Sequence, residues 1–327
     1  MNKNIKKLAV LTSGGDSPGM NAAIRAVVRA GIYNGMEVYG VRHGYKGLVY
    51  NQIVRLKSHS VSNIIQRGGT ILKTARCQKF KTKEGRDLAY KTLKDNNIDA
   101  LIVIGGDGTF TGANIFTKEY NFPIIGLPGT IDNDLYGTDY TIGYDTALNT
   151  VIEAVDKIRD TASAHNRLFF VEVMGRDAGF IALRSGIACG AEAVLIPEIP
   201  THIKELKSYL EEGFTRKKTS GIIIVAEGDN EGGALEIADK VRNDFTDYDV
   251  RVTILGHIQR GGAPSAFDRV TASTLGVGAV NALINGEKNI MVGLKNGYAT
   301  YVPIEKAIKH NKTIKKSLVD LVKILNV

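Results

Sequence analysis

Short apolar runs that alternate with amphipathic stretches constrain the fold of this chain more than any other feature of its sequence. The apolar runs are Leu8–Leu11, Glu37–Val41, Ala100–Ile104, Ile124–Leu127, Leu168–Val173, Ala193–Ile196, Ile222–Ala226 and Val250–Leu255. The helical stretches between them include Met20–Tyr33, Arg86–Asn96, Asp145–Thr161, Ile203–Thr215 and Leu235–Asp244, and a final stretch, Ile304–Leu325, is expected to form a pair of surface helices. Strands that alternate with helices predict an α/β protein with parallel sheets covered on both faces. Ligands of such sheets bind beyond the carboxyl ends of the strands.

Length and charge narrow the possible classes of protein. A chain of 327 residues favours two domains, and its net charge of +8 favours anionic partners. The lysines are scattered rather than gathered in a stripe with aromatic residues, so we expect small anionic metabolites and no nucleic acid. The 2 cysteines form no disulfide framework. Without an apolar stretch of about 20 residues or a signal-peptide core, the expected location is cytoplasmic, with no membrane partner.

The segment Thr12–Gly19 joins the first predicted strand to a helix and is rich in glycine. Ser17 and Pro18 resemble a helix N-cap and the first helical residue, and the free N–H groups of such a helix start attract phosphate. A tight strand-to-helix turn explains the same residues equally well. No Walker A lysine, dinucleotide fingerprint or protein-kinase signature is present. A phosphotransferase with this sequence therefore belongs to another class.

Two later segments carry the carboxylates. Gly105–Thr109 places Asp107 among glycines, where it could hold Mg²⁺ against nucleotide phosphates; NAD and lipid kinases share this string. Pro128–Asp134 carries Asp132 and Asp134 two residues apart, so that one could accept a hydroxyl proton while the other serves the metal. An Asx-rich turn is the alternative for this second segment.

Several arginines lie beside predicted strand ends or glycine-rich turns. Guanidinium groups bind phosphate through two parallel hydrogen bonds, although any single arginine is more often a solvated surface residue. His257 lies near Arg260, one of these arginines, and near glycines. The arginines are Arg76, Arg167, Arg176, Arg251 and Arg260.

Five motifs in register make the chain resemble the bacterial ATP-dependent 6-phosphofructokinases over nearly its whole length. They are Leu11–Ala23, Ile104–Thr109, Leu127–Thr141, Val171–Arg176 and Leu255–Pro264. The resemblance implies two Rossmann-like domains with parallel-rich sheets covered by helices. The larger, ATP-binding domain is expected at residues 1–142 plus 259–309. The smaller domain, which binds fructose 6-phosphate, is expected at residues 143–258 plus 310–327.

The resemblance also implies the roles of the site residues. Asp132 is expected to be the general base for the 1-hydroxyl of the sugar, assisted by Thr130, Arg76 and Arg176, while Asp107 and Asp134 serve Mg²⁺. The expected ATP contacts are Gly15, Tyr45, Arg76, Cys77, Gly106, Asp107, Gly108 and Thr109. The expected contacts of fructose 6-phosphate are Thr130, Ile131, Asp132, Met174, Gly175, Arg176, Glu227, His257, Ile258, Gln259 and Arg260, with Arg167 and Arg251 supplied by a neighbouring subunit.

Two glycines indicate the phosphoryl donor. Pyrophosphate-dependent relatives typically carry Asp where this chain has Gly108 and Lys where it has Gly129, and such side chains would fill the space of the ATP α-phosphate. ATP is therefore the expected donor. A pyrophosphate-dependent enzyme, a kinase for another ketohexose phosphate and a non-catalytic sugar-phosphate-binding regulator are the alternatives.

The resemblance further implies a homotetramer that ADP activates and phosphoenolpyruvate inhibits. Arg25 and Arg29 are one helical turn apart, as a phosphate clamp requires, although a basic helix face gives the same pattern. Ser58, Thr219 and Ser220 lack the charge that many relatives carry there, which weakens the expected effector response. The full expected effector set is Arg25, Arg29, Ser58, Asn63, Arg159, Gly190, Ala191, Glu192, Arg216, Lys218, Thr219 and Ser220.

Overall fold

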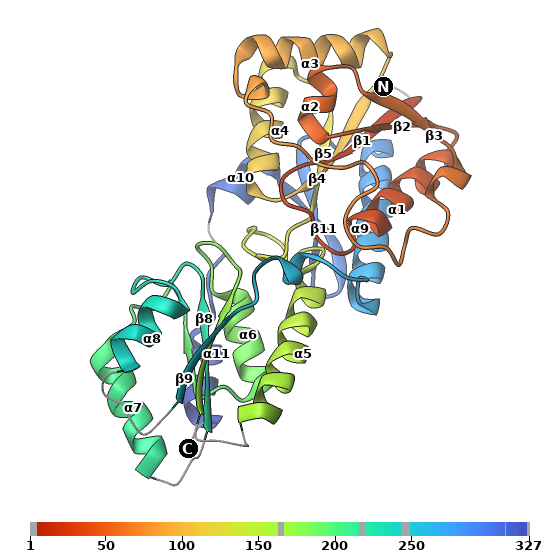
Figure 1. Cartoon of the computed structure of the whole chain (residues 1–327). Helices are drawn as coiled ribbons and strands as arrows, with labels where there is room; N and C mark the ends of the chain where they lie inside the picture. Colours follow the sequence, from red (N-terminus) through yellow and green to blue (C-terminus); the bar gives the residue numbers. More distant parts are fainter. Residues whose placement is uncertain (1–4, 163–166, 216–219, 243–248, 311, 326–327) are drawn as a thin grey trace. The chain divides into compact units, whose positions relative to one another are not determined.

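The chain divides into two compact units, each with its own sheet (Figure 1). The computed structural model describes residues 5–162, 167–215, 220–242, 249–310 and 312–325. The larger unit comprises Met1–Ile131, Leu135–Thr146 and Arg260–Lys312, and the smaller unit comprises Asp132–Asp134, Ala147–Gln259 and Thr313–Val327. The α/β class with parallel-rich sheets that the sequence predicts is confirmed.

The larger unit contains a seven-stranded sheet in the order β11-β10-β5-β4-β1-β2-β3. Its central pairs are parallel, whereas β3 and β11 run antiparallel to their neighbours at the two edges. The strands are β1 (Lys7–Thr12), β2 (Glu37–Val41), β3 (Ile53–Leu56), β4 (Ala100–Gly105), β5 (Ile124–Pro128), β10 (Ile290–Lys295) and β11 (Tyr298–Pro303).

Helices cover both faces of this sheet because β1 and β4 are apolar on both sides. One core joins them to α1 (Met20–Tyr33) and α9 (Ala266–Ile284), and the other joins them to the remaining helices. These remaining helices are α2 (Gly44–Val49), α3 (Lys83–Asp95), α4 (Asp107–Tyr120) and α10 (Ile304–Lys309). Two short 3₁₀ turns, η1 (Ser58–Val61) and η2 (Lys79–Lys81), connect them.

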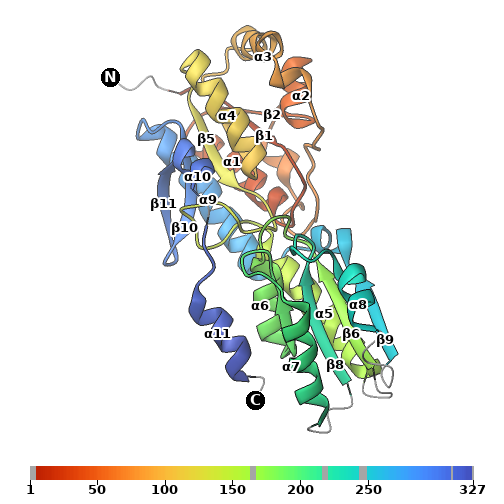
Figure 2. The same ribbon diagram turned by 90° about the vertical axis from the view of Figure 1, so that its left-hand side faces the viewer.

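The smaller unit contains a four-stranded, fully parallel sheet in the order β7-β8-β6-β9. Figure 1 shows α5 and α6 on the opposite side of this sheet from α7 and α8. Its elements are β6 (Arg167–Val173), β7 (Ala193–Leu195), β8 (Ser220–Ala226), β9 (Asp249–Ile254), α5 (Tyr144–Ala162, which begins in the larger unit), α6 (Phe180–Cys189), α7 (Ile203–Thr215), α8 (Ala234–Arg242), η3 (Gly256–Arg260) and α11 (Lys316–Leu325). Figure 2 shows the expected tail helices as two separate helices, α10 and α11.

The three glycine-rich segments lie at the carboxyl ends of β1, β4 and β5, which are neighbours in the sheet. The backbone N–H of Ser13 donates to Ile104 O at 3.0 Å, and that of Gly129 donates to Gly105 O at 3.0 Å. These two bonds join the ends of the strands in pairs. The fold therefore gathers the segments at one sheet edge, as expected for parallel strands.

One local prediction was wrong. The N-cap of α1 is Gly19, with φ 104°, rather than Ser17, whose hydroxyl is buried. Glycine adopts this left-handed conformation without strain, and a Cβ there would lie 2.7 Å from Ile142 Cγ2. In the segment Gly105–Thr109, α4 already begins at Asp107.

Candidate active site

The first strand end holds buried hydrogen-bonding atoms that lack partners. Among the residues that the structure describes, Ser17 Oγ, Thr109 Oγ1 and Arg260 Nε are buried without a hydrogen-bond partner. The Arg260 guanidinium lies directly against Gly15, where any side chain would collide with it. Buried polar groups are rarely left unsatisfied unless a ligand or water completes them. Thr109 Oγ1 lies beside Gly14 and the Arg260 guanidinium beside Gly15, so both contact this turn, and both can donate to phosphate oxygens.

The start of α4 is open to solvent. Asp107 and Gly108 are exposed in its first turn, and a Cβ added at Gly108 would meet nothing within 4 Å. The free N–H groups of a helix start attract anions. This end of α4 therefore has room for a phosphate and its metal ion.

Gly129 differs from Gly108 in its surroundings. A Cβ at Gly129 would lie 2.9 Å from Ile104 Cγ2 and 3.1 Å from Met20 Cε. Close packing in this chain therefore already favours glycine at this position, whatever the phosphoryl donor is. A Cβ at Gly108 would meet nothing within 4 Å, so packing does not explain this glycine. Gly108 is therefore the better of the two positions for distinguishing ATP from pyrophosphate as the donor.

An aromatic stack packs against the start of α4. Tyr45 is buried, stacks on Phe80 with ring centroids 4.0 Å apart, and donates from its hydroxyl to Thr109 O at 2.6 Å. Burial raises the pKa of Tyr45 far above its usual range, so its hydroxyl stays a donor. Arg76, exposed, and Cys77, half-buried, precede Phe80 on the connecting segment. The predicted ATP residues thus all belong to the larger unit.

Asp132 is buried in the smaller unit, only 4% exposed, and its Oδ2 lies 3.7 Å from Arg176 Nε. The Arg176 side chain is 58% exposed, so the pair joins a sheltered carboxylate to a solvent-facing cation. A carboxylate held beside a guanidinium in this way can accept a proton from a bound hydroxyl. Thr130 and Ile131, which precede it, belong to the larger unit, where Thr130 O accepts from Thr141 Oγ1 at 2.6 Å.

The turn after β6 is held in an unusual conformation. Arg176 has φ 54°, and Glu227 Oε1 accepts from the backbone N–H groups of Gly175 and Arg176 at 3.2 and 2.8 Å. Buried Gln259 accepts from Met174 N at 3.2 Å. Glu227 and Gln259, both predicted to touch substrate, therefore shape the Met174–Arg176 turn. His257 and Ile258, which directly precede Gln259 on η3, are exposed.

Arg167 and Arg251 lie away from that turn. Arg167 opens β6 and pairs in register with Asp249 on β9, which also binds Arg251 at 2.8 Å. The hydrogen bond from Arg251 holds the pKa of Asp249 below its usual range. At about 3.3 Å per residue, the length of β6 separates Arg167 from Met174 by roughly 20 Å. Within one chain, these arginines and the turn occupy opposite ends of the sheet.

The predicted effector residues fall into two groups, one in each unit. Arg25 and Arg29 lie on α1, and burial together with the nearby Arg29 charge lowers the pKa of Arg25. Ser58 and Asn63 are exposed near α1 on and after η1. Arg159 donates to Cys189 O at 2.6 Å and to Gly190 O at 3.2 Å, so it also caps α6.

Three of the remaining predicted effector residues lie in the described part of the smaller unit. Ala191 is buried, Glu192 Oε2 accepts from Ile222 N at 2.5 Å, and Ser220 opens β8. Arg216, Lys218 and Thr219 lie outside the described residues.

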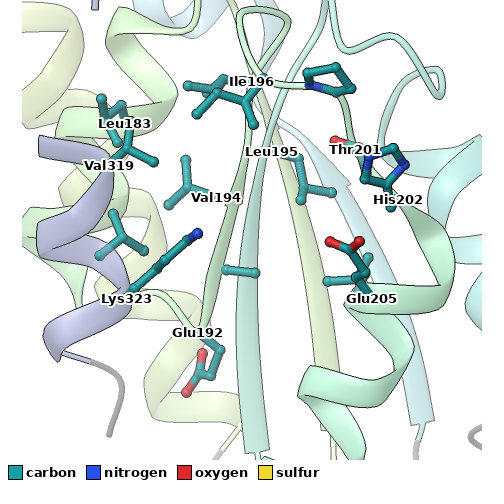
Figure 3. Close-up of a pocket in the computed structure, with 15 residues that line it drawn as sticks. Leu183, Glu192, Val194, Leu195, Ile196, Thr201, His202, Glu205, Val319 and Lys323 are labelled. Atoms are coloured by element: carbon teal, nitrogen blue, oxygen red, sulfur yellow. The ribbon is translucent and has the colours of Figure 1, made fainter. Parts of the chain in front are cut away.

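A pocket of about 380 Å³ lies in the smaller unit between β7, the start of α7 and α11 (Figure 3). Its walls are mainly apolar, and Figure 3 shows Lys323 on the α11 side and His202 and Glu205 on the α7 side. Glu192 lines it as well. The pocket shares no other residue with the predicted sites.

In the described part of the chain, no three histidine, cysteine or acidic side chains gather closely enough to hold a metal ion by themselves. None of the helices in those described ranges is long and apolar enough to cross a bilayer. Mg²⁺ commonly binds through one or two carboxylates plus substrate phosphates, so Asp107 at the open start of α4 fits that kind of site.

One important buried carboxylate escaped sequence reasoning. Asp268 on α9 is fully buried and accepts from Gly143 N, Thr146 N and Thr146 Oγ1 at 2.9, 2.8 and 2.5 Å. It thereby fixes the start of α5 and the strand bridge between Ile142 and Gly129 beside it. Only its place one turn after Ser265, which caps α9, could have drawn attention to it.

Comparison with known proteins decides the family. A family model described as Phosphofructokinase matches residues 7–283. The chain belongs to the phosphofructokinase family. It is therefore an enzyme, a phosphotransferase, and the recognition made from the five motifs is confirmed.

Relatives in the phosphofructokinase family match along the whole chain. ATP-dependent 6-phosphofructokinase 2 of Bacteroides thetaiotaomicron is 59% identical over 99% of both chains. The ATP-dependent 6-phosphofructokinase of Cytophaga hutchinsonii is 53% identical over 98% of both. ATP-dependent 6-phosphofructokinase 1 of Thermus thermophilus is 52% identical over 98% of this chain and 99% of its own.

Solved structures of the phosphofructokinase family share the fold. The phosphofructokinase of Saccharomyces cerevisiae is 38% identical with a TM-score of 0.88, over 98% of this chain and 47% of that one. A pyrophosphate-dependent phosphofructokinase from Marinobacter aquaeolei, 20% identical, has a TM-score of 0.84 over 98% of this chain and 91% of its own. At that identity the likeness concerns the fold alone.

Proposed function

We propose that this enzyme transfers the γ-phosphoryl group of ATP to the 1-hydroxyl of D-fructose 6-phosphate, giving fructose 1,6-bisphosphate and ADP. The ATP-dependent relatives, 52 to 59% identical, support this reaction. The observation that carries it is the pair of buried, unpartnered atoms Thr109 Oγ1 and Arg260 Nε beside Gly14 and Gly15, because both residues can donate to phosphate oxygens.

ATP binds the larger unit in this proposal. Its phosphates lie at the start of α4, where the helix dipole and exposed N–H groups favour negative charge. The open space at Gly108 accommodates the α-phosphate and therefore favours ATP over pyrophosphate. The contacts are Gly15, Tyr45, Arg76, Cys77, Gly106, Asp107, Gly108 and Thr109.

Asp107 and Asp134 hold Mg²⁺ in the proposed site. Both are carboxylates, the ligand type that Mg²⁺ prefers, and phosphate oxygens complete the coordination. When bound, the ion neutralises charge on the nucleotide phosphates.

Asp132 is the proposed general base. It is buried, and its Oδ2 lies 3.7 Å from Arg176 Nε, so an oxygen that can accept the proton of the sugar hydroxyl lies beside a cation. Arg76 and Arg176 supply positive charge toward the transferred phosphoryl group, and Thr130 helps to position the acceptor. Phosphoryl transfer depends mainly on such positioning and charge neutralisation.

The sugar phosphate binds the smaller unit through the Met174–Arg176 turn and the residues that shape it. Glu227 supports this role because it fixes both N–H groups of the turn. Thr130, Ile131, His257, Ile258, Gln259 and Arg260 complete the site. Arg167 and Arg251, at the opposite end of the sheet, would then reach the 6-phosphate of a neighbouring subunit within a homotetramer.

The reaction takes place in the cytoplasm in this proposal, as a step of glycolysis, and ADP and phosphoenolpyruvate regulate it. Support for an anionic effector comes from Arg25, which shares one face of α1 with Arg29; burial first, and the nearby charge of Arg29 second, lower the pKa of Arg25. Two cations held close together repel each other, and a bound phosphate relieves that repulsion.

The deciding experiment couples ADP release to substrate and compares donors. With fructose 6-phosphate, we expect turnover with ATP and little with pyrophosphate. Asp132→Ser should lower kcat about 10²- to 10⁴-fold with a nearly unchanged KM for the sugar phosphate, because a general base contributes roughly that factor.

Asp177→Ser is the matched control, since Asp177 is an exposed carboxylate directly after Arg176. It should behave like the wild type. Near-normal turnover by Asp132→Ser would remove Asp132 from the mechanism, and preference for pyrophosphate would overturn the choice of donor.

A further inference from the structure

A fully engaged guanidinium joins α3 to α4 in the larger unit. Arg86 on α3 donates from Nε and Nη2 to the two carboxylate oxygens of Glu119 on α4, each at 2.7 Å. Arg86 is only 9% exposed, and the hydrogen bonds that it donates to Glu119 raise its pKa. Bidentate arginine–carboxylate pairs of this kind fix geometry more strongly than an exposed pair does.

The same arginine also holds the segment that carries Arg76. Its Nη1 donates to Lys81 O at 2.7 Å and to Phe80 O at 3.2 Å, both on η2. A side chain at Gly85 would collide with Lys79 O, so the first turn of α3 lies directly on η2. η2, which begins two residues after Cys77, is therefore tied to both α3 and α4.

Phe80 carries this restraint to the start of α4. It stacks on Tyr45, whose hydroxyl binds Thr109 O, and the two rings lie on Gly112 of α4. A Cβ at Gly112 would come within 3.1 Å of Tyr45 and 3.3 Å of Phe80. Figure 1 shows α2, α3 and α4 lying together, as these contacts require.

We infer that Arg86 and Glu119 are positioning residues for the nucleotide site. Together with Phe80 they form a clamp, defined as Arg86, Glu119 and Phe80. This clamp fixes the Arg76–Cys77 segment relative to the open start of α4. Neither charged residue needs to touch ATP for this role. The inference rests on the proposed function, which assigns both segments to ATP.

The clamp acts by preorganisation. Without it, binding ATP must also order the segment, and ordering costs free energy that reduces affinity. The effect should appear in nucleotide binding and leave the sugar phosphate unaffected, because all three members lie in the larger unit.

The test uses Glu119→Gln and Arg86→Lys in the full-length enzyme. Both remove the bidentate ion pair, and Arg86→Lys also shortens the reach to the carbonyls of η2. We expect KM for ATP and the Kd of a non-hydrolysable ATP analogue to rise about tenfold. KM for fructose 6-phosphate should stay within twofold of the wild type.

Lys118→Gln is the matched control. Lys118 precedes Glu119 on α4 and makes an exposed ion pair with Glu305 at 3.1 Å. It should leave the Kd of the ATP analogue unchanged. Thermal unfolding of each variant shows that the assays are made on folded protein.

Two results would overturn the clamp. One is an unchanged Kd of the ATP analogue in both variants, with only the unfolding temperature lowered, which means a purely structural pair. The other is an equal rise of both KM values. The titration measures nucleotide affinity without turnover, so it tests the clamp even if fructose 6-phosphate proves to be the wrong acceptor.

Discussion

At the scale of single residues, Asp268 illustrates the conflict between burial and hydrogen bonding. It accepts three hydrogen bonds, which favour its charged form, yet burial prevails and raises its pKa to about 6 from 3.8. The nearby charge of Asp145 acts in the same direction as burial. The folded protein therefore binds a proton here at a pH where the unfolded chain has released it.

A pH-dependent loss of stability follows from this carboxyl. Because its folded pKa is raised, its contribution is complete below pH 3.8 and is lost as the pH rises to about 6. The free energy of unfolding of the wild type relative to Asp268→Asn should fall by about 3 kcal/mol across that range. Urea unfolding of both proteins at pH 4, 5, 6 and 7 measures it. A difference that does not change with pH would contradict the assignment.

Residues that carry chemistry could be predicted from the sequence, and residues that hold them could not. Asp107 and Asp132 sit in short glycine-rich strings after apolar strands, and such strings are visible along the chain. Asp268 binds Thr146 from 122 residues away, and Arg86 binds Glu119 from 33 away. No local pattern marks pairs that only folding brings together.

At the scale of elements, sequence periodicity predicted best where one face is buried and the other is wet. The bounds of α1 and α7 agree with the prediction, and β2 does as well. The prediction missed α9, whose buried small residues pack so closely against α1 that a Cβ at Gly276 would lie 2.6 Å from Ala26 Cβ. The exposed face of α9 is itself largely apolar, with Phe267, Val270, Val277 and Ile284 on it, so no polar face marks the helical period in the sequence.

Three strands of the larger sheet, β3, β10 and β11, were not predicted either. β10 is an internal strand, buried over Ile290–Leu294, whereas β3 and β11 are edge strands that pair antiparallel. Both edge strands are largely half-exposed or exposed. Their residues follow no continuous apolar run, so pairing with a neighbour rather than composition makes them strands.

Capping of α6 gives a prediction at this scale. Arg159→Met removes the donor to the carbonyl groups of Cys189 and Gly190 at the end of that helix, where a cation also favours the helix dipole. The free energy of unfolding should fall by about 1–2 kcal/mol. Lys157 lies on α5, the helix that also carries Arg159. Lys157→Met breaks only an exposed ion pair and should change the free energy of unfolding by less than about 0.5 kcal/mol. Equal stability of the two variants in urea would rule out the cap.

At the scale of the whole molecule, the two ends of the smaller sheet have different proposed tasks. The Met174–Arg176 turn follows the carboxyl end of β6, while Arg167 and Arg251 sit toward the amino ends of β6 and β9. In the proposed tetramer, each active site combines one end of one subunit with the other end of its neighbour. Activity would then depend on assembly.

Complementation between two inactive variants tests the shared site. The double variant Arg167→Ala/Arg251→Ala lacks the arginines that a subunit donates to its neighbour, and Asp132→Ser lacks the general base. Co-expressed hybrids should recover a fraction of wild-type kcat, about a quarter for random pairing, because some sites then receive a base from one subunit and arginines from the other. Each variant alone should stay nearly inactive. Hybrids no more active than the parents would mean that each chain builds its site alone.

The sequence by itself determined the α/β class, the three glycine-rich strand ends and the phosphofructokinase family, because parallel strands and phosphate loops leave local patterns. Tertiary structure decided what surrounds those loops: the Arg260 guanidinium on Gly15, the Arg86–Glu119 pair, and Asp268 at the start of α5. It also separated Gly108, which is open, from Gly129, which is crowded. The physical reason is that burial and hydrogen-bond partners depend on residues distant in the chain, which meet only after the sheets have formed.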